Sequence, residues 1–245
     1  MLELYMNNAK SVINNLKRYI DSQKKEIFPR FFKTGKGEYG QGDKFWGITV
    51  PNIRTVAKKY YIDISLNDIK ELINSEIHEI RLTGYIILTY KYEKDDRKEN
   101  IVTFYLNNLQ GVNNWDIVDL SCPKILGNYL LKHPEKRYLL YQLANSNNLW
   151  EKRISIVSTY PLIKKGEFTD TLQISSILLS HNHDLIHKAV GWMLREVGKK
   201  DITVLRDYLN ENIKDIPRTT LRYAIEKMDK EQKDKYLNMG INKQA

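Results

Sequence analysis

Two segments of the chain place a tryptophan one helical turn from a charged side chain. Trp115 and Asp119 are four residues apart, and Trp192 and Arg195 are three apart, so in a helix each pair lies on one face. An electron-rich ring attracts a cation, and a carboxylate can stabilise developing positive charge or deprotonate water. The two pairs could therefore act on a cationic substrate, although core tryptophans and a locally paired Asp119 would give the same pattern.

A set of mostly cationic residues recurs at intervals of about 35 residues. Five segments align in one register: EIRLTGYIILTYK, WDIVDLSCPKIL, KRISIVSTYPLIK, HKAVGWMLREVGK and LRYAIEKMDK. The intervals between them are 36, 36, 35 and 34 residues, as in two-helix repeats that stack into a solenoid. The register is occupied by Arg81, Ile117, Arg153, Lys188 and Arg222.

If the aligned helices form the inner wall of the solenoid, the four cations make a basic ladder along a concave face. Such a ladder suits a phosphate backbone. Ile117 is the exception, and it lies between Trp115 and Asp119. The sequence therefore predicts that the repeat binds a phosphate backbone and that the chemistry lies where the ladder is interrupted.

Composition and periodicity predict a folded, all-α protein. The 245 residues are 42% hydrophobic and 28% charged, and apolar residues return at intervals of three and four while strand-like alternation is scarce. We expect residues 1–245 to form one domain, an α-α superhelix. The net charge of +9 favours an anionic partner such as nucleic acid, with solubility as the alternative use of a basic surface.

Other features argue against several classes of protein. The single Cys122 excludes an internal disulfide and a cysteine-rich metal cage. His181, His183 and His187 fit a helix start better than a metal site, so we expect no metal and no cofactor. No apolar run reaches the roughly 20 residues that span a bilayer, and polar residues interrupt the first 20 positions. A cytoplasmic protein without membrane contact is expected.

Four segments resemble the AlkD-type family of DNA alkylation repair proteins, which are DNA glycosylases built from HEAT-like helical repeats. They spread over roughly residues 30–230. The matching segments are FWGITVPNIRTVAKKY, NNWDIVD, NLWEKRISIVST, and HKAVGWMLREVGKKD followed by PRTTLRYAIEKM. The resemblance implies a lesion site made of Trp115, Asp119, Arg153, Trp192 and Arg195.

The resemblance also implies a reaction, in which the N-glycosidic bond of a cationic N3- or N7-alkylated purine is hydrolysed in duplex DNA. The product is an abasic site, and a monomer is expected to act without strand cleavage. The catalytic residues would be Asp119, Trp115 and Trp192, and the DNA-binding residues Arg153, Arg195, Lys188, Arg81 and Arg222.

Two points stay open. The first is the function, for which the alternative is a non-catalytic HEAT-like repeat module that binds DNA or a protein partner through the concave face. The second concerns the glycine-rich segment 33–43, which is either a basic loop touching DNA through Lys33, Lys36 and Tyr39 or an inert surface loop.

Overall fold

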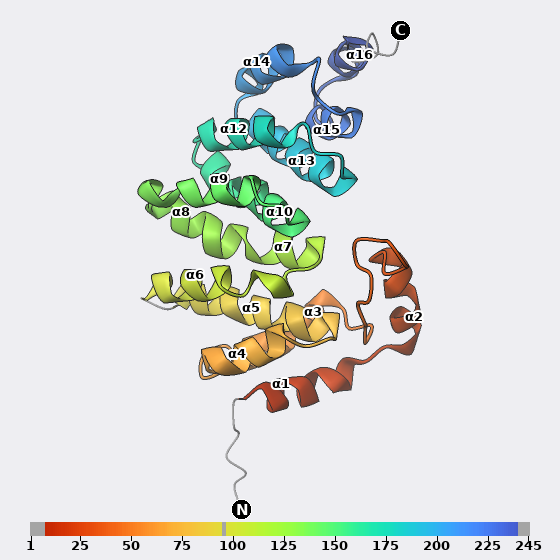
Figure 1. Ribbon diagram of the computed structural model, residues 1–245, viewed down its shortest axis with the longest axis vertical. Helices are drawn as coiled ribbons and strands as arrows, with labels where there is room; N and C mark the ends of the chain where they lie inside the picture. Colours follow the sequence, from red (N-terminus) through yellow and green to blue (C-terminus); the bar gives the residue numbers. More distant parts are fainter. Residues whose placement is uncertain (1–7, 95–96, 240–245) are drawn as a thin grey trace, which may run out of the picture. The chain divides into compact units, whose positions relative to one another are not determined.

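The computed structural model describes residues 8–94 and 97–239, and every named element within them is helical (Figure 1). An isolated bridge between Lys44 and Ile77 is the extended pairing recorded in this part of the chain. The predicted all-α fold is confirmed. None of the described helices combines the length and apolar character needed to cross a membrane. The chain forms two compact units, Met1–Ile125 (unit 1) and Leu126–Ala245 (unit 2); a single domain over residues 1–245 stays a prediction.

Unit 1 is built around α5, whose side chains are buried on nearly every side. This helix contacts α3, α4, α6 and α7, which explains why it lacks the polar face of a surface helix. Polar side chains cap two of these neighbours, Ser65 at the start of α4 and Asn114 at the start of α7. The helices are α1 (Ala9–Leu16), α2 (Ser22–Phe31), α3 (Val50–Tyr60), α4 (Leu66–Ile73), α5 (His78–Lys94), α6 (Lys98–Leu106) and α7 (Trp115–Ser121).

Unit 2 is organised around a second long helix, α13, which contacts α10, α11, α12, α14 and α15. Figure 1 shows successive helices of this unit lying side by side. Its helices are α8 (Asn128–Lys132), α9 (Tyr138–Ala144), α10 (Leu149–Val157), α11 (Tyr160–Lys164), α12 (Thr169–Leu178), α13 (Asp184–Lys200), α14 (Ile202–Asn212), α15 (Arg218–Ala224) and α16 (Lys230–Met239).

The register found in the sequence falls on helices that pack directly against one another within each unit. In unit 1, α5 and α7 are in contact; in unit 2, α13 contacts both α10 and α15. Gly191 permits the closest of these approaches, because a Cβ at this position would lie 2.5 Å from the Cβ of Tyr223 and 2.6 Å from the carbonyl oxygen of Thr220. Direct packing of consecutive registers is what stacked helical repeats require.

A buried carboxylate fixes the segment between α2 and α3. Glu79, 1% exposed, accepts hydrogen bonds from the backbone N–H groups of Trp46, Gly47 and Ile48, with the bond from Gly47 at 2.7 Å. Gly47 has φ of 78°, and a Cβ there would meet the carbonyl oxygen of Asp21 at 2.2 Å. The FWGI segment is therefore held against the first turn of α5 by Glu79 and requires a glycine.

Replacing Glu79 by glutamine should destabilise the protein by about 2–3 kcal/mol, because an amide puts an NH2 donor against backbone donors and removes the charge that strengthens these bonds. Urea denaturation measures the change. Glu76→Gln is the matched control, since Glu76 is exposed and pairs with Lys44 at the surface; it should cost at most about 0.5 kcal/mol. Equal midpoints for the two variants would contradict the role assigned to Glu79.

Candidate active site

The Trp115–Asp119 pair lies on α7, which begins at Trp115. The Oδ1 atom of Asn114 caps the helix by accepting the N–H of Trp115 at 2.8 Å. Trp115 and Asp119 are both half-buried, while Ile117 and Val118 between them are fully buried. The helix thus turns its apolar side chains into unit 1 and leaves Trp115 and Asp119 half-buried, one turn apart.

An aromatic stack supports the ring of Trp115 from within unit 1. Trp115 stacks on Phe32 with ring centroids 5.5 Å apart, and Phe32 stacks on Phe45 at 5.0 Å. Phe31 meets Trp115 edge-on at 5.8 Å and is itself 58% exposed. The ring of Trp115 is therefore supported by Phe32 from behind and has Phe31 beside it. None of the three phenylalanines is among the site residues predicted from the sequence.

A buried histidine joins the loop before α3 to the start of α7. His78, the first residue of α5, is 1% exposed. Its Nε2 atom lies 2.8 Å from Oδ2 of Asp116, and its Nδ1 atom lies 3.3 Å from Oδ2 of Asp43. Burial opposes a charged imidazole, but the carboxylates of Asp116 and Asp43 outweigh it and raise the pKa of His78 to about 9. The ring is an imidazolium at neutral pH.

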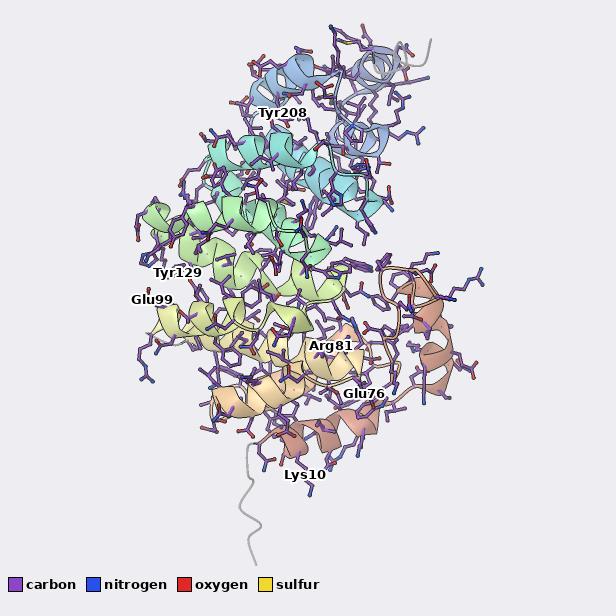
Figure 2. The ribbon with its side chains drawn as sticks, viewed as in Figure 1. Lys10, Glu76, Arg81, Glu99, Tyr129 and Tyr208 are labelled. Atoms are coloured by element: carbon purple, nitrogen blue, oxygen red, sulfur yellow. The ribbon has the colours of Figure 1, made fainter. Side chains whose placement is uncertain are left out.

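Arg81 completes this cluster from the next turn of α5 (Figure 2). Its Nη2 atom donates to Oδ1 of Asp43 at 2.7 Å and to Oδ1 of Asn113 at 2.9 Å, and Nη1 donates to the carbonyl oxygen of Ser75. Burial opposes ionisation of Asp43, yet His78 and Arg81 hold the pKa of this carboxyl below its usual value. Two cations therefore balance the carboxylates of Asp43 and Asp116.

This environment bears on the predicted DNA contact of Arg81. The side chain is buried, and a phosphate contact would require exchange of the partners described above. The contacts therefore favour a structural role, in which Arg81 holds the end of segment 33–43. That segment also closes on itself through a 3.0 Å bond from Gly40 N–H to the Lys33 carbonyl, while Lys33 and Lys36 remain exposed.

In unit 2, Arg153 ties α10 to the start of α13. It is 5% exposed, and its Nη1 atom donates to the carbonyl oxygen of Leu185 at 2.6 Å. Only the last carbonyls of a helix lack a hydrogen-bond partner within the helix. Leu185 lies in the first turn of α13, so its carbonyl has a helical partner and the bond from Arg153 is additional to it. The register position occupied by Arg153 is consequently a packing position as well as a predicted DNA contact.

Trp192 and Arg195 lie one turn apart on α13, as predicted, and both are half-buried. The ring of Trp192 lies 6.3 Å from that of Tyr160 on α11. Arg195 forms an ion pair with Glu226, which follows α15, and a longer one of 3.9 Å with Glu196. An acidic side chain thus already occupies one side of this guanidinium.

The remaining ladder cations are more accessible. Lys188 forms a 2.6 Å ion pair with Asp184 one turn earlier on α13, with 40% of its side chain exposed, and Arg222 is exposed on α15. His183 is the N-cap of α13, as the sequence predicts, and its Nδ1 atom accepts the N–H of Leu185. Among the described residues, no three or more histidine, cysteine, aspartate or glutamate side chains are arranged to hold a metal ion.

Comparison with known proteins identifies a family whose model matches this chain. Residues 12–228 match the model of a family described as DNA alkylation repair enzyme. The fold is similar to that of a solved structure described as a predicted DNA alkylation repair enzyme from Enterococcus faecalis. The TM-score is 0.71 at 16% identity, covering 86% of this chain and 97% of that one. No curated protein matches the chain.

The stabilisation contributed by His78 should disappear at high pH. The pKa of His78 is raised from 6.5 to about 9 on folding, so this contribution is complete below about pH 6.5 and is lost as the pH rises through about 9. The difference in unfolding free energy between the wild type and His78→Gln should shrink by roughly 2–4 kcal/mol between about pH 6 and about pH 10. Urea denaturation measures it, with His133→Gln, at a histidine whose side chain is 44% exposed, as the control. A pH-independent difference would show that His78 is not held as a cation.

Proposed function

We propose, given that this chain belongs to the family of DNA alkylation repair enzymes, that it is a DNA glycosylase for cationic N3- and N7-alkylated purines in duplex DNA. The observation that carries the proposal is at α7, where Trp115, whose ring stacks on Phe32, and Asp119 are both half-buried and lie one helical turn apart. A ring and an acid in this arrangement fit a substrate that becomes cationic at the reacting sugar.

The reaction needs one carboxylate. An alkylated purine already carries a positive charge, so it leaves as a neutral base when it takes the electron pair of the glycosidic bond, and no general acid is required. Asp119 stabilises the positive charge that develops on the deoxyribose and accepts a proton from the attacking water. The hydroxyl of that water adds to C1′, which leaves an abasic site and an intact strand.

The two tryptophans assist through their π faces. An aromatic ring over a cation contributes about 0.5–2 kcal/mol, depending on how far the pair is desolvated. Phe32 and Phe45 behind Trp115 keep that ring from turning away, so its orientation is set before substrate binds. Trp192, whose ring lies 6.3 Å from that of Tyr160 on α11 in a tilted arrangement, has the same chemical role in the proposal.

The DNA backbone is held by cations of both units, consistent with the net charge of +9. Arg195, Lys188 and Arg222 retain exposed surface and are the stronger candidates for phosphate contacts. Arg153 and Arg81 are proposed to contribute chiefly by holding the helices that carry the site, with phosphate contacts requiring new side-chain partners. Phosphate contacts position the strand without reading its sequence.

The alternative function is a non-catalytic module that binds DNA or a protein through the same cations. Asp119 favours the enzyme, because a carboxylate weakens phosphate binding, whereas the proposed reaction requires one. The two functions differ in a single measurable product, free alkylated base.

The purified protein should release N7-methylguanine or N3-methyladenine from methylated duplex DNA without added metal or nucleotide, and Asp119→Asn should lose about 100-fold or more of this rate. Liquid chromatography of released base under single-turnover conditions measures it. Asp119→Asn should bind an abasic-site analogue as well as the wild type. Asp234→Asn makes the same change at an exposed position on α16 and should leave the rate unaltered.

Two outcomes would overturn this assignment. Unchanged release by Asp119→Asn would remove the carboxylate from the mechanism. If the wild type binds DNA but releases neither N7-methylguanine nor N3-methyladenine, the non-catalytic module would be favoured.

The acidic partner of Arg195 gives a separate test of its phosphate contact. Glu226→Gln should tighten DNA binding by about two- to five-fold at low salt, because the carboxylate paired with Arg195 competes with phosphate. Arg195→Gln should weaken binding and reduce the slope of log K against log salt by about one. Fluorescence anisotropy measures both. Glu231→Gln changes the charge equally at an exposed site on α16, and an identical gain from it would show a general effect of charge.

A further inference from the structure

We propose that His78 is a positioning residue: by bridging Asp43 and Asp116 it fixes the first turn of α7 and thereby orients Trp115 and Asp119. This inference rests on the proposed function for its catalytic consequence. It concerns a residue that is not among those implied by the family resemblance and that lies entirely within unit 1.

Three parts of unit 1 meet at the imidazole. His78 begins α5, Asp43 lies in the loop between α2 and α3, and Asp116 is the second residue of α7. The backbone N–H of His78 also donates to the carbonyl oxygen of Lys44 at 2.9 Å, so both its main chain and its side chain hold the loop. A side chain that is 1% exposed cannot exchange these partners for water.

The geometry requires a cationic ring. Both ring nitrogens face carboxylate oxygens, at 2.8 Å and 3.3 Å, and a carboxylate accepts hydrogen bonds but does not donate them. A neutral imidazole has one N–H, so one of its nitrogens would turn a lone pair towards a carboxylate. The doubly protonated ring satisfies both partners at once.

His78 reaches the predicted catalytic residues by two routes. Asp116 adjoins Trp115 and accepts the N–H of Ile117 at 2.8 Å, so the imidazole holds a carboxylate that is itself bound to the first turn of α7. The imidazole ring also packs against the ring of Phe32, with centroids 5.0 Å apart, and Phe32 stacks on Trp115. A shift of this turn moves Trp115 directly and Asp119 through the same short helix.

The charges around the ring explain why the arrangement holds. The charged groups that face His78 are Asp43 from the loop, Asp116 from α7 and Arg81 from its own helix. With the imidazolium the cluster is neutral, whereas a neutral substitute would leave one uncompensated negative charge in the interior. His78 itself is too deeply buried to touch DNA, so it acts through the residues that it holds.

The first test separates positioning from stability. We expect His78→Gln to slow base release at saturating enzyme by about tenfold or more, while its affinity for a duplex with an abasic-site analogue stays within about two-fold of the wild type. Ile69→Ala is the matched control: it opens a cavity beside α4, also in unit 1, and removes none of the hydrogen bonds of the cluster. Assays are run at a temperature at which both variants are folded. A release rate for His78→Gln within about two-fold of that of Ile69→Ala would overturn the proposal.

The second test does not depend on activity. In protein labelled with 5-fluorotryptophan, the ¹⁹F signal of Trp115, assigned with Trp115→Phe, should move as the pH passes through about 9 and should lose this titration in His78→Gln. The signal of Trp192 should be the same in both proteins. If the wild type releases no base, the proposed function fails and this signal still decides the positioning role. A Trp115 signal that is identical in both proteins at every pH would reject it.

Discussion

Ionic charge buried in unit 1 must be balanced where it lies, and the cluster of Asp43, His78, Arg81 and Asp116 meets that demand with partners from three separate elements. Buried ion pairs add little net stability, because the loss of hydration offsets most of their attraction, but removal of one member is costly. Their effect is to allow one arrangement of the loop, α5 and α7 and to penalise others. The placement of Trp115 depends on that selectivity.

The first turn of α5 therefore organises this half of the protein. Consecutive residues of one helix point in different directions, so His78 and Glu79 serve different neighbours. His78 holds the loop and α7, while Glu79 accepts hydrogen bonds from backbone N–H groups of the segment just before α3. The aromatic stack then fills the space beside them, with Phe32 and Phe45 against the imidazole. Polar and apolar contacts thus act on the same small region.

Much of the helical arrangement could be predicted from the sequence, since periodicity and the 34- to 36-residue intervals locate helices that do pack together within each unit. The pairs Trp115–Asp119 and Trp192–Arg195 also follow from spacing along a helix. The surroundings of the cations could not be predicted. Arg81 and Arg222 share one register, yet the first is buried against Asp43 and the second is exposed, because the difference lies in partners far away in the sequence. His78 gave no local signal for the same reason.

The separation of those partners ties the placement of Trp115 and Asp119 to the folding of unit 1 as a whole. Asp43 lies 35 residues before His78, and Asp116 lies 38 residues after it, so the cluster forms only when both intervening stretches have folded back on α5. Closing such loops costs entropy before any contact is gained, and the contacts then appear together. We expect the placement of Trp115 and Asp119 to be gained and lost cooperatively with this cluster. Loss of the chain through Asp43 would dismantle the support of Trp115 along with the segment itself.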